Sequence, residues 1–335
     1  MLKRKWMAFL LTGLMAVGML LAWDVSTEGA EKIDKVTLAF ANVSATGSLS
    51  DTIYLAYFKK ISELSDGAIE IQYFPDAILG AELANLSSLQ TGALDMGAIS
   101  STLVTLITKV GIFDFPYFIT DRSQMVQLEK AGILDEIRAD AEQQGIVILG
   151  FNENGFRHIT NNTRPINTPE DLAGLKIRTP SNNIRLETFR VINANPTPIN
   201  FSELYQALQQ GVVDGQENPL SVIHASRLYE VQKYLSLSNH IYSPNYICVS
   251  KIVWDKLSPA QQAVLKEATA YLDVYGRELG AQADAETVAY LEKEGMSVNN
   301  CNIQAFQNAL MPLWERFSPD VGPEFVQKSK IALGY

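Results

Sequence analysis

Histidine and cysteine are scarce in this chain. Its 335 residues include only three histidines, His158, His224 and His240, and two cysteines. None of them stands at a metal-ligand spacing. The glycine patterns of dinucleotide and phosphate loops and the Gly-x-Ser-x-Gly nucleophile elbow are also missing. We therefore expect neither a metal nor a cofactor, and the sequence favours a protein that is not an enzyme.

The two cysteines, Cys248 and Cys301, allow two interpretations. In an oxidising compartment they could form a disulfide bond. Alternatively, they are two separate buried thiols. Cys248 lies in the apolar run 246–249, which favours the second interpretation.

Positive charge is also limited. The formal net charge is −10, and lysine and arginine form no long run. Because binding to a nucleic-acid backbone needs clustered cations, nucleic acid is excluded as a partner. An anionic ligand would have to be bound by individual arginines rather than by the overall field of the protein.

A long hydrophobic run occurs only at the N-terminus. Residues 3–5 are Lys-Arg-Lys, and residues 6–23 are an uncharged, largely apolar stretch. This pattern predicts a signal peptide, residues 1–29, that directs the protein to the periplasm. The alternative is an uncleaved membrane anchor, because such a stretch can just span a bilayer.

The first part of the mature chain alternates between strand and helix patterns. Short apolar or alternating runs bounded by turn residues indicate strands, and longer runs that end at glycine indicate helices. This order predicts a parallel or mixed sheet covered by helices. The expected strands are 36–41, 69–74 and 94–99, and the expected helices are 51–64 and 81–90.

The middle of the chain continues in the same way. We expect residues 198–219 to form a capped helix, a stop at Gly211, a short strand at Val212-Val213 and a polar loop closed by Pro219. Ser258 is predicted to cap a long helix that reaches about Glu294 and spans the molecule. The other expected strands are 146–150, 155–160 and 176–178, and the other helices are 125–144, 183–192, 303–316 and 323–331.

A weak internal repeat relates two parts of the chain. Residues 89–95, Leu-Gln-Thr-Gly-Ala-Leu-Asp, resemble residues 208–214, Leu-Gln-Gln-Gly-Val-Val-Asp. Each copy combines a helix end, a glycine, two apolar residues and an aspartate. We interpret them as equivalent corners of two similar α/β lobes with a cleft between them.

Polar side chains at strand ends are candidates for a ligand site. Arg178 ends a short strand, at the side of an open α/β sheet where ligands usually bind, and its guanidinium can hold a carboxylate with two hydrogen bonds. Asn218 and Arg157 are further candidates in the second lobe. Asn42 and Ser100 follow strands of the first lobe and could face them across the cleft. Each of these side chains also has an ordinary structural interpretation.

Several motifs follow one another in a recognisable order. They are Gly155–Asn161, Gly174–Pro180, Asn195–Pro198, Phe201–Leu208, Val213–Pro219, Tyr229–Leu235 and Ser238–Ile241. In this order they resemble the DctP family, the extracytoplasmic solute receptors of TRAP (tripartite ATP-independent periplasmic) transporters. The resemblance extends from about Lys35 to the C-terminus.

The resemblance implies a bilobal, periplasmic-binding-protein-like α/β fold. Two mixed-sheet lobes would be joined by hinge strands and a long spanning helix. We expect lobe I to comprise residues 30–155 and about 244–283. Lobe II would comprise residues 156–243 and about 284–335.

The resemblance also implies roles for individual residues. Arg178 matches the arginine that pairs with the substrate carboxylate, Arg157 a second arginine that faces the substrate, and Asn218 an asparagine that bonds the same carboxylate. Phe201 matches an aromatic residue that packs on the ligand. Glu217 and His240 resemble members of a hydrogen-bond network near the hinge. Asn42 and Ser100 match ligand-facing first-lobe positions of the sialic-acid receptors in this family. Those receptors have a glutamate at the position of Ser100, so we expect the ligand of this chain to be an anion other than sialic acid.

The implied function is capture of a small organic acid by hinge closure, followed by delivery to a TRAP membrane permease. We expect a monomer. A hexuronate or another sugar acid is the preferred ligand, with a C4-dicarboxylate as an alternative. The competing functions are a sensory receptor for a membrane kinase and a secreted lyase or isomerase.

Overall fold

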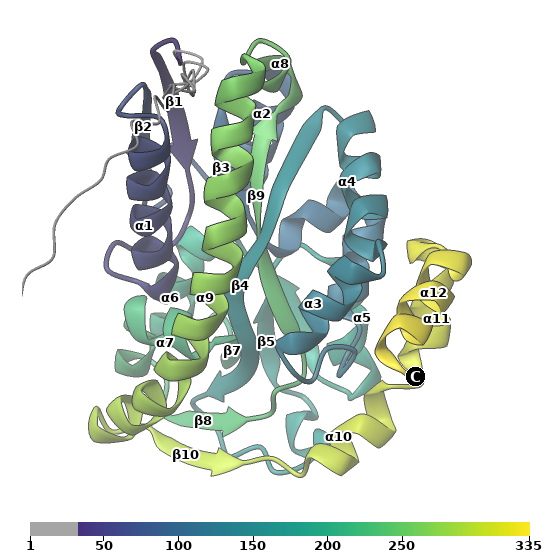
Figure 1. Ribbon diagram of the computed structural model, residues 1–335. Helices are drawn as coiled ribbons and strands as arrows, with labels where there is room; N and C mark the ends of the chain where they lie inside the picture. Colours follow the sequence, from purple (N-terminus) through teal and green to yellow (C-terminus); the bar gives the residue numbers. More distant parts are fainter. Residues whose placement is uncertain (1–32) are drawn as a thin grey trace, which may run out of the picture. The chain divides into compact units, whose positions relative to one another are not determined.

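A mixed β-sheet of ten strands runs through residues 33–335, the part of the chain that the computed structural model describes (Figure 1). The predicted signal peptide, residues 1–29, lies outside the described residues. The strands are β1 (Val36–Ala41), β2 (Ile69–Phe74), β3 (Met96–Ile99), β4 (Ile146–Asn161), β5 (Lys176–Thr179), β6 (Asn195–Pro198), β7 (Gly215–Pro219), β8 (Tyr234–Leu237), β9 (Tyr242–Ser250) and β10 (Ser297–Asn300).

The strand order divides this sheet into two similar halves. Neighbouring strands follow the order β2-β1-β3-β9-β4-β7-β5-β6, and β8 joins β10 to β4. In the first half, β1 pairs in parallel with β2 and β3, and β3 is antiparallel to β9. In the second half, β5 pairs in parallel with β6 and β7, and β7 is antiparallel to β4. This bilobal mixed α/β arrangement confirms the predicted fold class.

The two copies of the sequence repeat occupy equivalent corners. Gly92 and Gly211 both have positive φ, 75° and 68°, at the helix ends. The Asp95 carboxylate accepts a hydrogen bond of 2.8 Å from the backbone nitrogen of Ala39 in β1. The Asp214 carboxylate accepts one of 2.7 Å from the backbone nitrogen of Lys176 in β5. Each aspartate therefore bonds to the strand that lies beside its own in the sheet, and the two copies form equivalent corners, as the repeat predicted.

Helices cover both faces of the sheet. The α-helices are α1 (Leu49–Leu64), α2 (Glu82–Thr91), α3 (Ser123–Lys130), α4 (Ile133–Gln143), α5 (Asn183–Val191), α6 (Leu204–Gln209), α7 (Leu220–Ala225), α8 (Lys251–Trp254), α9 (Pro259–Lys293), α10 (Ile303–Leu310), α11 (Leu313–Val321) and α12 (Pro323–Leu333). Short 3-10 helices are η1 (Ser101–Thr105), η2 (Thr108–Asp114), η3 (Pro169–Leu172), η4 (Phe201–Glu203) and η5 (Leu228–Glu230).

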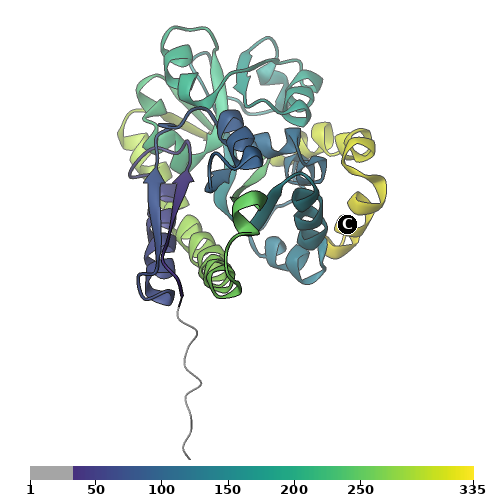
Figure 2. The ribbon, with the colours of Figure 1, turned by 90° about the horizontal axis from the view of Figure 1, so that it is seen from above.

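The long helix α9 runs beside β4 across both halves of the sheet (Figure 1). Ser258 and Gln261 form the capping box that starts it, as the sequence predicted. It packs against α1 (Figure 2). The hydroxyl of Thr269 lies 3.0 Å from that of Tyr57. A Cβ added to Gly280 would lie 2.6 Å from Cγ of Glu153 in β4. Glycine is therefore required for this close approach of helix and strand.

Several predicted elements are organised differently. The expected helix 303–316 is two helices, α10 and α11, because Pro312 between them cannot continue a helix. The expected helix 125–144 is two helices, α3 and α4, because Gly132 has a φ of 72° that no right-handed helix contains. The expected strands 146–150 and 155–160 are one strand of 16 residues, β4. Register shifts near Leu149 and Asn154 let β4 continue past the glycines that suggested an end.

The prediction for residues 212–219 was wrong. Val212 and Val213 belong to the turn after α6, and Val212 is exposed. The polar segment Gly215–Pro219, expected as a loop, is strand β7, and all five of its residues are buried. Its side chains find hydrogen-bond partners inside the protein, so burial does not require them to be apolar.

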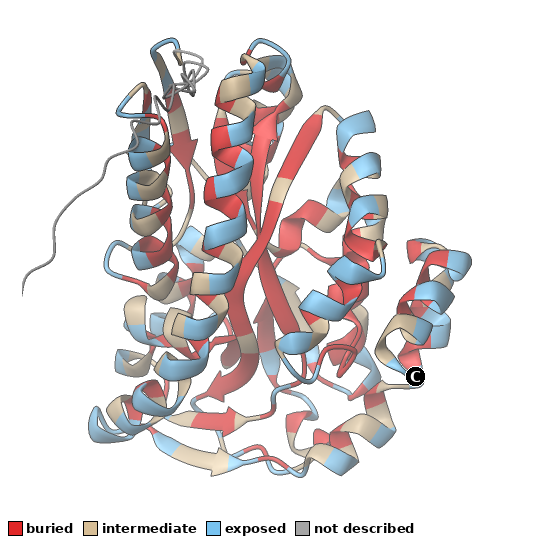
Figure 3. Ribbon diagram, viewed as in Figure 1, coloured by how far each residue is buried: buried red, intermediate tan, exposed pale blue. Residues whose placement is uncertain are grey.

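Three apolar clusters form the interior, and the central strands are buried along most of their length (Figure 3). Cys248 and Cys301 are both buried and unpaired, which confirms the favoured interpretation of separate thiols. The Cys301 thiol donates a hydrogen bond to the carbonyl of Ile166. Within residues 33–335, no helix is long and apolar enough to cross a membrane.

The last two helices, α11 and α12, return to the segment 113–137. The indole of Trp314 donates to the carbonyl of Pro116, and the Tyr335 hydroxyl donates to the carbonyl of Phe118. Phe317 and Phe325 belong to the same apolar cluster as Leu128 and Ile133. These helices thus pack on residues that the predicted division assigned to lobe I.

Candidate functional site

A pocket lies between the two halves of the sheet and encloses about 870 Å³, part of it open to solvent. One side is formed by the loop after β1, by α2 and by η1. The other side is formed by residues of β5, β7, η4 and α7. The lining residues include Val43, Ser44, Ser48, Ser50, Glu82, Ser100, Ser101, Thr102, Asn154, Arg157, Arg178, Asn200, Phe201, Asn218, Ser226 and Asn245.

Arg178 projects from β5 into this pocket. Its Nε donates a hydrogen bond of 2.8 Å to the carbonyl of Ile199, and its guanidinium lies 6.0 Å from the centre of the Phe201 ring. Arg178 is 3% exposed, and no carboxylate of residues 33–335 forms an ion pair with it. Burial, together with the nearby Arg157 and Arg185, lowers the pKa of Arg178 to about 9. A buried cation of this kind is stabilised by an incoming anion.

Arg157, in contrast, has a carboxylate partner within the protein. From β4 it donates to both carboxylate oxygens of Glu217 in β7, and its Nη2 lies 2.9 Å from Oε1. Nη2 also donates to the backbone carbonyl of Glu217 and to Oδ1 of Asn218, at 2.6 and 3.0 Å. The antiparallel pairing of β4 and β7 places these residues side by side. Arg157 therefore reaches the pocket as a paired group.

A third arginine, Arg185 of α5, completes the buried network. Its Nη1 lies 3.2 Å from Oε1 of Glu217, and its Nε donates 2.7 Å to Asp114. Burial alone would raise the pKa of Glu217, but Arg157 and Arg185 outweigh it and hold this pKa well below its usual range. The sequence motifs contained no sign of Arg185 or Asp114, since 71 residues separate them.

The charges of this buried network do not balance. Arg157, Arg178 and Arg185 supply three cations, whereas Glu217 and Asp114 supply two anions. All five residues are at most 3% exposed. Because the two anions bind Arg157 and Arg185, the surplus positive charge resides on Arg178. Burying an unpaired charge is costly, so the site is prepared to accept one negative group at Arg178.

Asn218 and His240 take part in the same network. The side-chain amide of Asn218 lines the pocket, accepts from Arg157 and donates to Gln216. His240 lies behind it, with Nε2 3.4 Å from Glu217 and Nδ1 2.8 Å from the Ser238 hydroxyl. Burial lowers the pKa of His240, so it is neutral at physiological pH. The structure thus brings Glu217 and His240, the two residues expected in a hydrogen-bond network, together with the expected ligand-binding residues Arg157 and Asn218.

The two predicted first-lobe residues differ in position. Ser100 lines the pocket, and its hydroxyl accepts a hydrogen bond of 3.3 Å from the Asn154 amide. Asn42 is buried outside the pocket lining. Its amide donates to the Tyr73 hydroxyl, and its carbonyl oxygen accepts from the backbone nitrogen of Ser44. Asn42 therefore shapes the loop that supplies Ser44 and Ser48.

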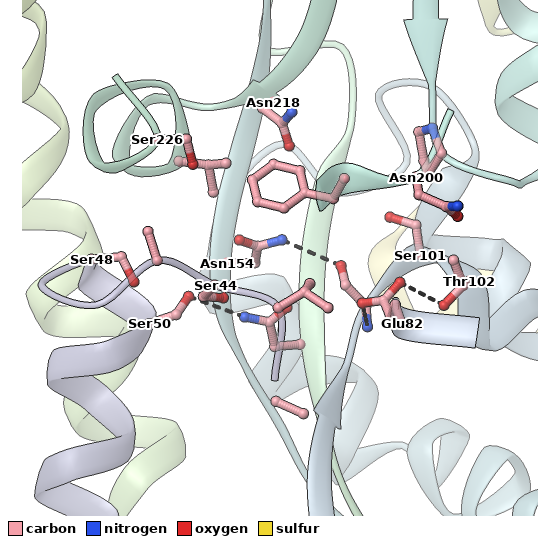
Figure 4. Close-up of a pocket in the computed structure, with 18 of the residues that line it drawn as sticks. Ser44, Ser48, Ser50, Glu82, Ser101, Thr102, Asn154, Asn200, Asn218 and Ser226 are labelled. Atoms are coloured by element: carbon pink, nitrogen blue, oxygen red, sulfur yellow. Dashed lines mark hydrogen bonds between the residues drawn. The ribbon is translucent and has the colours of Figure 1, made fainter. Parts of the chain in front are cut away.

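Several polar side chains of the pocket, labelled in Figure 4, were not predicted from the sequence. The most prominent is Glu82, at the start of α2. Its carboxylate accepts from the Ser100 backbone nitrogen at 2.7 Å and from the Thr102 hydroxyl at 2.5 Å. An acidic residue in a first helical turn is common for electrostatic reasons alone, so the sequence carried no sign of a site. The other missed residues in this view are Ser44, Ser48, Ser50, Ser101, Asn154, Asn200 and Ser226.

These features define a class of protein. Two similar α/β halves share long connecting strands, and a polar pocket with one unpaired buried cation lies between them. This is the architecture of a bilobal binding protein for a small anion. Within residues 33–335, no three potential ligand side chains come close enough to hold a metal ion.

Comparison with protein families identifies the particular family. Residues 40–320 match the model of the bacterial extracellular solute-binding proteins, family 7, named DctP. The chain belongs to this family, which confirms the resemblance seen in the sequence. The sialic acid-binding periplasmic protein SiaP of Vibrio cholerae is 31% identical over 88% of this chain and 98% of that protein.

Solved structures lead to the same family. A TRAP periplasmic solute binding protein from Polaromonas sp. JS666, bound to D-erythronate, has a TM-score of 0.85 and 32% identity; the match covers 88% of this chain and 98% of that one. The sugar acid binding protein DctPAm from Advenella mimigardefordensis, in complex with galactonate, has a TM-score of 0.85 and 29% identity; here the match covers 90% and 99%.

Proposed function

We propose that this chain is a periplasmic receptor that captures a small organic acid in the pocket and delivers it to a TRAP membrane permease. The observation that carries the proposal is the buried, unpaired guanidinium of Arg178 in the pocket. The residues at the N-terminus serve as the signal peptide that directs export. The family membership supports the permease as the partner.

The acid binds through its carboxylate. Arg178 forms the ion pair, and Asn218 lies beside it in the lining of the pocket. Phe201 packs on the carbon skeleton of the ligand, and Ser100 and Asn154 contact its other end from the first half of the sheet. Arg157 acts mainly by holding Asn218 and Glu217 in place, because its own charge is already paired.

Closure of the two lobes around the hinge strands buries the acid. Lobe I comprises residues up to 155 and about 244–283, and lobe II begins at residue 156 and ends at 243. We add α11 and α12 to lobe I because they pack on residues 113–137. The C-terminal part of lobe II is then limited to about residues 284–310. The protein works as a monomer and performs no chemistry on the acid.

Thermal unfolding of the exported protein in the presence of organic acids tests the proposal. A ligand that binds only the folded state raises the melting temperature. We expect a rise with at least one sugar acid, no rise with the corresponding neutral sugar, and no rise for Arg178→Ala with the same acid. A rise with the neutral sugar alone would contradict the proposal.

A further inference from the structure

Glu82 is the pocket residue whose charge the proposed function leaves unexplained. It is half-buried at the start of α2 and lines the same pocket as Arg178. Among the described residues, no lysine, arginine or histidine forms an ion pair with it. In Figure 4 its carboxylate lies on the first-lobe side, far below Asn218 in the view.

The carboxylate of Glu82 retains unused acceptor capacity. One oxygen accepts from the Ser100 backbone and the other from the Thr102 hydroxyl. An ionised carboxylate has about four lone-pair sites, so roughly two remain for a ligand. Because such a carboxylate only accepts hydrogen bonds, the ligand must present a donor at this point.

The cations of the pocket also limit the number of anionic groups that a ligand can carry. Its lining contains two cations, Arg157 and Arg178. Arg157 is bound to Glu217, so only Arg178 is available to pair with an anionic group. A ligand with carboxylates at both ends would place its second negative charge near Glu82 with no cation to compensate it. Like charges brought together in a partly buried site repel each other, so such a ligand should bind more weakly.

The rest of the lining is suited to hydroxyl groups. Serine, threonine and asparagine side chains line the same pocket as Glu82, and each can both donate and accept. They are Ser44, Ser48, Ser50, Ser101, Thr102, Asn154 and Asn245. A polyhydroxylated carbon chain can satisfy such a lining, whereas an unsubstituted chain leaves several polar groups without partners.

We propose that the ligand is a polyhydroxylated monocarboxylate, a sugar acid with a single carboxylate, and that Glu82 selects against acids with a carboxylate at each end. A hydroxyl of the ligand donates to Glu82, while its single carboxylate pairs with Arg178. This inference rests on the proposed function and narrows it to one chemical class. It names Glu82 as the residue that determines specificity.

Matched acid pairs test the inference, since each pair differs only in the terminal group. We would use erythronate with tartrate, gluconate with glucarate, and galactonate with galactarate. Isothermal titration calorimetry on the exported protein, freed of bound ligand by unfolding and refolding, gives both dissociation constants of each pair. For the pair that binds, we expect the diacid to bind at least about 30-fold more weakly, the size expected of a like-charge contact. Equal affinity for both members would overturn the inference.

A substitution of Glu82 tests whether this residue causes the discrimination against diacids. Glu82→Gln keeps the size and one acceptor of the side chain, so the hydrogen bond to Ser100 or Thr102 is retained. We expect the ratio between diacid and aldonate to fall at least about tenfold, because the like-charge cost is removed. The exposed Glu63→Gln in α1 is the control, and its ratio should equal that of the wild type. An unchanged ratio in a folded Glu82→Gln protein would overturn the assignment.

Other outcomes separate this inference from the function on which it rests. An ω-amino acid that binds more tightly than the aldonate of equal length would show that Glu82 binds an ammonium group, and the inference would be wrong. Tight binding of a diacid alone would also overturn it, while the receptor function would stand. If no acid of any kind binds, the proposed function itself is wrong.

Discussion

Arg178 and Glu82 are the two charged side chains of the pocket that lack an oppositely charged partner among residues 33–335. One belongs to β5 of the second half of the sheet and the other to α2 of the first half. A ligand between them meets a cation on one side and an anion on the other. The pocket therefore distinguishes the two ends of the molecule that it binds.

Replacing Arg178 should remove acid binding without unfolding the protein. We expect Arg178→Ala to weaken binding by at least about 30-fold, because truncating one partner of a buried charge pair costs roughly 2–5 kcal/mol. Arg178→Lys should weaken it at least about tenfold, since lysine cannot offer the planar two-donor contact. Calorimetry with the acid that raises the melting temperature measures both. The exposed Arg190→Ala in α5 is the control and should bind normally.

Glu217 should be essential for stability rather than only for binding. It is fully buried and its carboxylate contacts both Arg157 and Arg185. Removing one partner of a buried ion pair typically costs about 3–5 kcal/mol. Denaturant unfolding of Glu217→Gln without ligand should therefore show a loss of this size. Arg178→Met should lose much less, because Arg178 has no internal ion pair, and equal losses in the two variants would contradict this distinction.

Asp273 in α9 should make stability depend on pH. Burial raises the pKa of Asp273 to about 7, and one of its carboxylate oxygens has no hydrogen-bond partner. Since the folded protein holds this proton more tightly than the unfolded chain, the contribution of Asp273 to stability is complete below about pH 4, the ordinary range of an aspartate. This contribution is lost as the pH rises through about 7.

Asp273→Asn should remove this dependence. The asparagine cannot ionise, so the variant should melt at a higher temperature than the wild type at pH 8, and the difference should shrink toward pH 4. Melting curves across this range, with the exposed Asp255→Asn as a control, measure the effect. A difference that stays constant with pH would show that Asp273 does not titrate as described.

Gly280 tests the close packing of α9 on β4. In an exposed helix, alanine is more favourable than glycine by about 1 kcal/mol. Here an added Cβ would lie 2.6 Å from Glu153 Cγ, so we expect Gly280→Ala to destabilise the protein by about 1–3 kcal/mol. Denaturant unfolding gives the value. Ala281→Ser, at an exposed position of the same helix, should stay within about 0.5 kcal/mol of the wild type.

The sequence was sufficient where local patterns and tertiary structure agree. The strand 69–74 has the bounds that its alternation predicted, and the capping box at Ser258 starts the long helix as expected. The repeated Gly and Asp of two corners predicted two similar halves. Arg178 could be selected because it lies near the end of a short strand, at the side of an open α/β sheet where ligands usually bind.

The features that could not be predicted depend on contacts between residues that are distant in the sequence. Strand β7 is polar, so its pattern indicated a loop, and only its pairing with β4 and β5 makes it a buried strand. Asp114 and Arg185 meet across 71 residues without a local motif. Glu82 looked like an ordinary first-turn acid. Asn42 follows a strand as expected, yet its side chain bonds to Tyr73 instead of lining the pocket.

A crystal structure of the protein with its tightest-binding acid tests the central claim most directly. We expect the ligand carboxylate within hydrogen-bond distance of Arg178 and a ligand hydroxyl within hydrogen-bond distance of Glu82. A ligand bound in the pocket with its carboxylate away from Arg178, while Arg178 still bonds only to the carbonyl of Ile199, would contradict it.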